Sequence, residues 1–309
     1  MDEPTALRIK DELVDAGGEA VRAGMYSSDR PNRLYHFTDC QGLVGILTSR
    51  CLWASLATGL NDDSEVRYGL ERAELFLRAN RTEGIDPDFL QKVVHYLEPR
   101  NTFTGRTIEL EAYVISFCAR MDRSVHWLHY GKSGTGCAIG FDTGGLIRPP
   151  SELTPVIYDE TQQDQFIGSI VEKVWAVVQR YELDAKDTDI KKVLYETAAD
   201  SAAAHIRLGA PMLKNSAFQS EEEWRLIIRD LRIDGLEPEN GIRMEIKFRV
   251  CGGRVVPYWE YSLNEVPIAD LVLGASFPMP AEDPAIAILL RKSAEGRPAV
   301  VRSAVPIRP

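Results

Sequence analysis

Two glutamates, Glu221 and Glu223, are the residues whose type and spacing most directly suggest chemistry. They stand in a run of three acids, which is followed by tryptophan, arginine and an apolar stretch over 226–228. The apolar stretch predicts a buried strand, and side chains of an extended segment alternate between two faces. We therefore expect the two glutamates to share one face and Glu222 to point the other way. Paired carboxylates at the mouth of a strand can stabilise positive charge on a sugar or deprotonate a nucleophile. The competing interpretation is a solvated acidic turn ahead of a strand.

The elements that must position these glutamates follow one another irregularly. Strands are expected near 33–38, 52–55, 109–118, 137–141, 156–158, 224–229, 242–249 and 270–273, and helices near 5–24, 41–49, 64–80, 88–97, 124–130, 162–182, 187–209 and 284–292. Because there is no regular alternation of strand and helix, the pattern predicts an α+β fold with a mostly β core and helical insertions. We expect a single α+β domain over 1–309, with an N-terminal helical extension over 1–30 and a helical insertion over 160–212.

The composition of the chain restricts its partners. Its 309 residues are 44% hydrophobic and 27% charged, as in ordinary globular proteins. The net charge of −10 argues against general binding of polyanions, which depends on many Lys and Arg contacts to phosphates, although a local basic groove stays possible. There is no apolar run of about 18 residues and no basic and apolar leader at the start, so we expect a cytoplasmic protein with no membrane segment.

Several motifs that could hold a metal or a phosphate fail on inspection. The five cysteines form no CxxC pair and no zinc spacing with the five histidines, so we expect reduced thiols and no metal. His126 and His129 could share a helix face, but nothing nearby completes a metal set. Gly131-Lys132-Ser133 lacks the glycine that a P-loop needs five residues earlier, and Asp142-Thr143-Gly144 has no second copy to share a proton. Both are expected to be turns.

A series of short motifs runs in order along nearly the whole chain. They are Leu34-Tyr35-His36-Phe37-Thr38, Gly42-Leu43 with Ile46-Leu47, Leu60-Asn61-Asp62 with Glu65, Ile115-Ser116-Phe117, Trp127 and Tyr130 before Gly136, Gly140-Phe141-Asp142, Glu221-x-Glu223-Trp224-Arg225, and Ile268 with Leu271-Val272-Leu273-Gly274. Together they resemble a bacterial family of unknown function, the DUF2971 proteins. That family implies no activity.

The opening Tyr35-His36-x-Thr38, followed by Gly42-Leu43-x-x-Ile46-Leu47, is also similar to the opening of ADP-ribosyltransferases. RNA 2′-phosphotransferases and DNA-modifying members of that superfamily open in the same way. The resemblance implies a split, mostly antiparallel β-sheet that binds NAD, the substrate, in its cleft. It also implies a catalytic glutamate late in the chain and a serine on a middle strand, which the order His36, Ser116, Glu221-x-Glu223 fits.

The resemblance implies roles for the two glutamates and their nearest companions. Glu223 would bind the ribose 2′-hydroxyl and stabilise the oxocarbenium ion as nicotinamide leaves. Glu221 would orient or deprotonate the acceptor, and Ser116 would support the catalytic glutamate. His36 would hydrogen-bond the ribose or the amide on the nicotinamide side, with Thr38 beside it.

Four further residues are expected near the ligand. Tyr35 belongs to the same motif as His36, and Trp127 or Tyr130 could stack on nicotinamide. Asn61 either contacts the ligand or caps a turn. The third aromatic of the superfamily has no counterpart that we can identify, and the Asn61-Asp62-x-x-Glu65 motif has no superfamily equivalent.

Three functions remain open. The first is an NAD-dependent ADP-ribosyltransferase that modifies a nucleic acid or a protein, as a toxin or a phage-defence effector with an antitoxin or defence-operon partner. The second is an NAD glycohydrolase with water as the acceptor. The third is a non-catalytic ligand sensor or interaction domain of a defence system, in which the carboxylate pair is structural. Even without the resemblance, His, Ser and Glu converging on one cleft could hold a ribose and place negative charge near an emerging cation without a metal.

Overall fold

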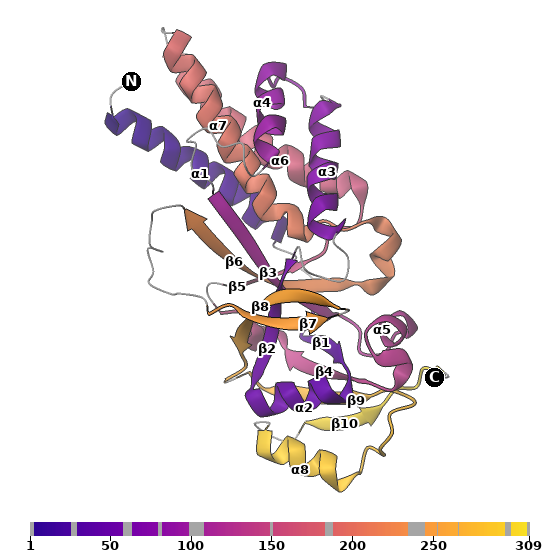
Figure 1. Cartoon of the computed structure of the whole chain (residues 1–309). Helices are drawn as coiled ribbons and strands as arrows, with labels where there is room; N and C mark the ends of the chain where they lie inside the picture. The colour runs from indigo at the N-terminus through magenta and orange to yellow at the C-terminus, as the bar shows by residue number, and fades with distance from the viewer. Residues whose placement is uncertain are drawn as a thin grey trace.

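A layer of helices lies on one side of a twisted sheet, and further helices cover the other side (Figure 1). The computed structural model describes residues 3–25, 30–57, 64–79, 82–98, 108–148, 151–182, 188–233, 245–251, 253–264, 266–293 and 298–307. The helices are α1 (Glu3–Met25), α2 (Cys40–Ser49), α3 (Ser64–Arg78), α4 (Pro87–Leu97), α5 (Ser124–His129), α6 (Glu160–Glu182), α7 (Thr188–Gly209) and α8 (Pro284–Ser293). The strands are β1 (Arg33–Thr38), β2 (Cys51–Leu56), β3 (Ile108–Cys118), β4 (Cys137–Asp142), β5 (Ser151–Pro155), β6 (Glu223–Ile233), β7 (Lys247–Cys251), β8 (Arg254–Ser262), β9 (Ile268–Leu273) and β10 (Ala299–Arg302).

The described strands form one mostly antiparallel sheet. Its main path runs β10-β9-β4-β1-β3-β2-β8-β7, and β6 pairs with β3 on one side and β5 on the other. The pairing of β10 with β9 is parallel, and the other strand pairs are antiparallel. The expected α+β fold, with a mostly antiparallel sheet and helices, is therefore confirmed.

The edge of β3 that faces away from β6 is shared by two strands that diverge. Here β2 pairs with Val114 through Ser55, whereas β1 meets β3 at Cys118 through Tyr35. Residues 115–117 of β3 have no ladder partner on this edge among the described strands. We call this interruption the strand gap. It leaves backbone groups of β3 to be satisfied by something other than a neighbouring strand.

Side chains of β3 alternate between two separate cores. Val114 joins the helical layer, where it packs with residues of α1, α3, α4, α6 and α7 and with Ile227 of β6. Its neighbours Tyr113 and Ile115 face the opposite core, which α2 and α8 cover. Each large apolar side chain buried in this way contributes about 1.5–3 kcal/mol to folding. Because both faces of β3 and β6 are covered, the apolar run over 226–228 has no polar alternation.

Helix starts follow the local chemistry of the sequence. Asp39 caps α2, accepting a hydrogen bond from Gly42 N at 2.7 Å. Asp86 caps α4 in the same manner, and Pro87 occupies the first turn, where its missing N–H is no loss. In α1, Gly17 lies so close to the ring of His205 in α7 that a Cβ there would collide with it. The two helices can pack closely for this reason.

Some predicted strands were misplaced. A strand was expected over 156–158, but β5 ends at Pro155, and Ile157 forms only an isolated bridge to Leu213. The long strand β8 was missed because Pro257 interrupts its pattern, and proline is rare inside a sheet. Of the strand expected over 242–249, the structure shows β7 from Lys247, while 242–244 lie outside the described residues.

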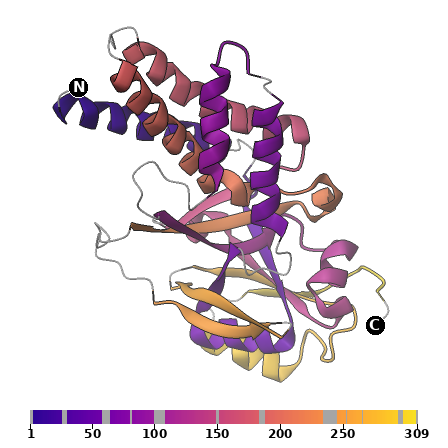
Figure 2. The ribbon, with the colours of Figure 1, turned by 45° about the horizontal axis from the view of Figure 1, so that its top comes forward.

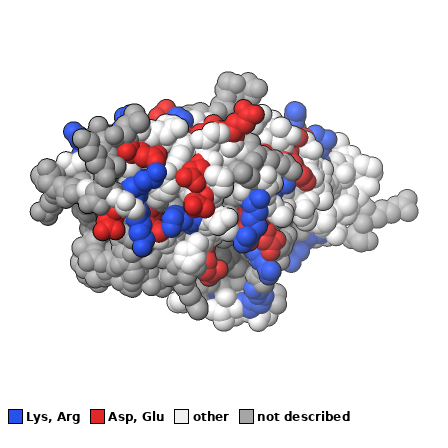
Figure 3. Space-filling model, turned by 90° about the horizontal axis from the view of Figure 1, so that it is seen from above, with Lys and Arg blue, Asp and Glu red and all other residues white. Residues whose placement is uncertain are grey.

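The surface of the helical layer carries both charge signs. Seen from above, Lys and Arg are interspersed with Asp and Glu, with no broad area of one sign among the described residues (Figure 3). On α3, for example, the exposed Arg67 and Glu71 form an ion pair at 2.7 Å. None of the described helices is both long and apolar enough to cross a membrane.

Candidate functional site

A small cavity of about 80 Å³ collects most of the chemistry-bearing residues that the sequence singled out. Its lining residues are His36, Phe37, Ser116, Cys118, Tyr130, Glu221 and Glu223. They come from β1, β3, β6, the end of α5 and the short 3-10 helix Ser216–Glu221. The cavity thus lies where the strand gap meets the edge of the helical layer.

The pairing of β3 with β6 places the inner part of the site. Glu223 stands opposite Cys118, and Arg225 stands opposite Ser116. Partners across an antiparallel ladder project from the same face, so these four side chains share the face that Val114 uses to enter the helical core. A continuous strand pair therefore carries the serine and the glutamate to one place.

The two glutamates reach the cavity by a different route from the predicted one. Glu221 ends the 3-10 helix, and Glu222 has φ 43° and ψ 47°, in the left-handed region. The expected strand alternation at these residues was therefore wrong, because β6 begins only at Glu223. The left-handed residue turns the chain so that Glu221 and Glu223 still face the same cavity. Such a conformation costs a non-glycine residue on the order of 1–3 kcal/mol.

Glu222 points away from the cavity, as expected. Its carboxylate forms ion pairs with Arg120, at 3.1 Å, and with Arg123. These partners are about half exposed or more, so the pairs contribute little to stability.

Two buried cations hold the glutamates of the cavity. Lys214 Nζ lies 2.7 Å from Glu221 Oε2 and 2.9 Å from Glu223 Oε2. Arg225 adds a fork to Glu223, with Nε donating to Oε1 and Nη2 donating to Oε2, both at 2.9 Å. All four side chains are at most 7% exposed. Burial opposes ionisation of Glu223, but the charges of Arg225 and Lys214 and hydrogen bonding from Ser116 hold its pKa down to about 2.

Sequence reasoning missed Lys214 altogether. The residue follows α7 in a segment with no regular periodicity, so no pattern marks its side chain as inward-facing. The fold anchors this segment through its backbone. Gln163 donates to the carbonyl of Lys214 at 2.9 Å, and Arg225 Nη1 donates to the carbonyl of Pro211 at 2.7 Å. The helical layer thereby sets the position of the bridging ammonium group.

His36 fills the strand gap. Its Nδ1 lies 3.0 Å from the carbonyl of Ser116, one of the β3 groups without a strand partner, and its ring meets Phe117 edge-on. Because a carbonyl only accepts, Nδ1 carries the proton and Nε2 is left as an acceptor in the neutral ring. Burial, followed by the charge of Arg249, lowers the pKa of His36 and keeps the ring neutral at neutral pH.

Tyr130 forms the outer wall of the cavity. Its hydroxyl donates to Glu221 Oε1 at 3.0 Å, while its side chain remains partly open to solvent. Burial raises the pKa of this hydroxyl, so it stays protonated and acts as a donor. Nearby His126 is buried and bonds the carbonyl of Glu221 at 2.8 Å.

Three of the expected ligand contacts do not reach the cavity. Trp127 is fully buried, packs edge-on against Phe37 at 4.9 Å and donates to Asp122 at 2.6 Å, so its ring has no face for a ligand. Tyr35 is buried beside Asp270, at 3.5 Å from its carboxylate. Thr38 ends β1 opposite Cys137 and is not part of the lining. Asn61 and Asp62 lie outside the described residues.

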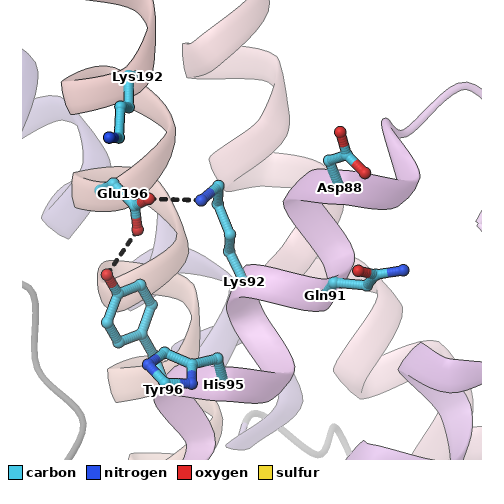
Figure 4. Close-up of a pocket in the computed structure, with 7 residues that line it drawn as sticks. All are labelled: Asp88, Gln91, Lys92, His95, Tyr96, Lys192 and Glu196. Atoms are coloured by element: carbon cyan, nitrogen blue, oxygen red, sulfur yellow. Dashed lines mark hydrogen bonds and ion pairs between the residues drawn. The ribbon is translucent and has the colours of Figure 1, made fainter.

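A wider depression lies elsewhere, between α4 and α7 (Figure 4). It measures about 580 Å³ and is open to solvent. Lys92 and Tyr96 both point toward Glu196, which accepts a hydrogen bond from Tyr96 at 2.5 Å and forms an ion pair with Lys92. Glu196 is the one carboxylate that Lys92 and Tyr96 bind there, whereas the small cavity gathers two carboxylates around a bridging lysine.

Comparison with known proteins supports one of the two resemblances. Residues 126–226 match the family described as "Protein of unknown function (DUF2971)". This third of the chain includes Tyr130, Lys214 and both cavity glutamates, so the expected DUF2971 resemblance is supported over this stretch. No curated protein and no solved structure matches the chain. The resemblance to ADP-ribosyltransferases gains no support from these comparisons.

Proposed function

We propose that the cavity binds the nicotinamide–ribose end of NAD and cleaves the bond between them, so that ADP-ribose passes to an acceptor. One observation carries the proposal. An ionised carboxylate, Glu223, opens onto the same enclosed space as a neutral imidazole, His36, and a serine hydroxyl, Ser116. Three adjacent strands supply these groups, which suits them to hold a ribose rigidly.

The chemistry requires negative charge at a fixed place. When the bond between ribose C1′ and the pyridinium nitrogen breaks, its electron pair goes to the nitrogen and positive charge develops on the ribose. Glu223 can stabilise that charge, because its pKa of about 2 keeps it ionised throughout the physiological range. Arg225 fixes both carboxylate oxygens, so little reorganisation is needed as the cation forms.

Glu221 and Tyr130 are suited to the acceptor side of the reaction. Both line the cavity, Tyr130 is partly open to solvent, and the tyrosine hydroxyl bonds one carboxylate oxygen of Glu221. An acceptor hydroxyl or water that replaced this bond would lie beside a carboxylate able to take its proton. The acceptor oxygen would then form the new bond to C1′.

The size of the cavity limits what enters it. At about 80 Å³ it is smaller than the roughly 300–1,000 Å³ of most ligand pockets. Only the reacting end of the dinucleotide can be enclosed, and Tyr130 must rotate outward to admit it. Rotations of this kind are common on binding. The same small volume favours hydrolysis as the second candidate, since water fits where a large acceptor does not.

Purified protein incubated with NAD, labelled separately in the nicotinamide and in the adenylate, tests the proposal. The reaction is run alone, with single-stranded and duplex nucleic acid, and with a protein mixture. Adenylate label on a macromolecule supports transfer, and free ADP-ribose supports hydrolysis. Absence of nicotinamide release under every condition contradicts the proposal and favours a structural carboxylate network in a ligand-sensing domain.

A further inference from the structure

Trp53, an exposed tryptophan, lies on β2, the strand that leaves β3 where the strand gap begins. The ladder between β2 and β3 ends at the pair Ser55 and Val114. If the same register continued for two more residues, Trp53 would stand opposite Ser116. Trp53 projects from the same face as Ser55, because the residues between and beside them, Leu52 and Ala54, enter the opposite core. It therefore lies on the side of β3 away from Glu223, outside the residues that line the cavity.

Aromatic and cationic groups surround this tryptophan. The ring of Tyr258, on β8, lies 4.6 Å from that of Trp53 at an interplanar angle of 33°. The guanidinium of Arg249, on β7, lies 5.6 Å from the Trp53 ring centre. Tyr258 is buried and supports the arrangement, whereas Trp53 leaves 46% of its surface open. The β7–β8 hairpin lies in the half of the molecule away from the helical layer (Figure 2).

Arg249 is a cation without a counter-ion in the part of the chain that the structure describes. Its Nη2 donates to the hydroxyl of Ser55 at 2.9 Å, and its buried Nε has no hydrogen-bond partner. The neighbouring Lys247, in contrast, is paired with Glu260 at 2.8 Å. A partly buried guanidinium with an unused donor, in a chain of net charge −10, is suited to an anionic ligand.

We propose that Trp53 and Arg249 form a nucleotide subsite, in which the adenine base stacks on Trp53 and a phosphate binds Arg249. The inference rests on the proposed function, since the nucleotide would be the ADP half of the dinucleotide whose nicotinamide end enters the cavity. One aromatic platform with one unpaired cation matches a single nucleotide. A nucleic-acid strand needs a row of such platforms and cations, and these three strands do not present one among the described residues.

Calorimetric titration of the full chain with ADP, which lacks nicotinamide, tests the subsite apart from catalysis. Trp53→Ala is expected to weaken ADP binding by roughly 5- to 150-fold, the range of stacking one base on one aromatic ring. Trp53→Phe should restore most of the affinity, and Arg249→Gln should weaken ADP more than it weakens adenosine. The matched control is Phe248→Ala, which removes a more exposed aromatic ring (66%) from the other face of the hairpin and should change nothing.

The outcomes separate this inference from the proposed function. If ADP binding depends on Trp53 while NAD is not cleaved, the subsite stands and the catalytic proposal fails. If NAD is cleaved but Trp53→Ala binds ADP as the wild type does, the subsite is refuted and catalysis stands. Binding of a ten-residue oligothymidine, lost in Trp53→Ala, together with no binding of ADP, would refute the nucleotide assignment and identify a nucleic-acid surface. Equal losses in Phe248→Ala would also refute it.

Discussion

Arg225 donates to both carboxylate oxygens of Glu223, each at 2.9 Å, although the two residues are only two positions apart on the same strand. Neighbours at this spacing project from the same face, so the strand itself orients the fork. The pair is buried, and Lys214 joins it from outside the strand. The carboxylate is thus fixed toward the cavity by partners whose removal should be measurable.

Replacing Lys214 by methionine should destabilise the protein. The change leaves Glu221 and Glu223 buried with only Arg225 to balance them, and breaking a buried ion pair in this way costs about 3–5 kcal/mol. Urea unfolding at neutral pH measures the loss. Lys173→Met is the control, because its pair with Glu19 lies on the surface and should matter little. Equal stability of Lys214→Met and wild type would show that the bridge contributes nothing to the fold.

The stability of the protein should depend on pH through Glu223. Its folded pKa, about 2, lies below its ordinary value of 4.5, so the unfolded chain binds this proton first. The resulting stability is fully present above pH 4.5 and is lost as the pH falls toward 2. Its size is on the order of 3 kcal/mol, at 1.36 kcal/mol for each unit of pKa.

Unfolding free energies of wild type and Glu223→Gln, measured between pH 7 and pH 2, check this dependence. The wild type should lose stability more steeply than the variant across that range. The same slope in both proteins would assign the acid sensitivity to other groups.

Much of the scaffold could be predicted from the sequence, because its signals are local. Asp39 is a typical N-cap residue at the start of α2, and the apolar run over 226–228 is typical of a strand that is covered on both faces. The positions of Glu221 and Glu223 in one cavity also followed from the sequence, but not the left-handed turn at Glu222 that produces it. Local alternation was the wrong reason for a correct juxtaposition.

The remaining features depend on contacts between distant segments. Lys214 is inward-facing only because Gln163 and Arg225 hold its segment. The strand gap that His36 fills exists because β1 and β2 diverge along β3. The sequence of any one of these strands does not reveal that divergence. Trp127 or Tyr130 was expected to stack on a ligand, and the fully buried Trp127 shows that residue type alone does not distinguish a binding aromatic from a core aromatic.

Trp127→Ala should cost about 3–5 kcal/mol of folding free energy, since it empties a fully buried site against Phe37. Denaturant unfolding measures the loss, and Leu128→Ala, at an adjacent side chain that is 53% exposed, should change the stability by less than about 0.5 kcal/mol. A well-folded Trp127→Ala with a specific loss of NAD binding would instead restore its expected role as a ligand contact.

His36→Ala should weaken NAD binding by roughly 3- to 10-fold, the value of one neutral hydrogen bond. Calorimetry measures the change, with His129→Ala as the exposed control. Because burial lowers the pKa of His36 below 6.5, the affinity of the wild type should stay constant from about pH 8 to pH 6.5. Equal affinities in His36→Ala and wild type would remove this residue from the site.

The most direct test compares two adjacent glutamates. Nicotinamide release from NAD is measured for Glu223→Gln and Glu222→Gln. Circular dichroism and thermal melting confirm that each variant is folded. If Glu223→Gln does not fold, Glu223→Asp replaces it, because aspartate keeps the negative charge. The account predicts a loss of about 100-fold or more for Glu223→Gln, the usual effect of removing one electrostatic group from a reacting centre. It predicts nearly unchanged release for Glu222→Gln, whose carboxylate faces Arg120 and Arg123 on the surface. Folded Glu223→Gln that releases nicotinamide at the wild-type rate would contradict it.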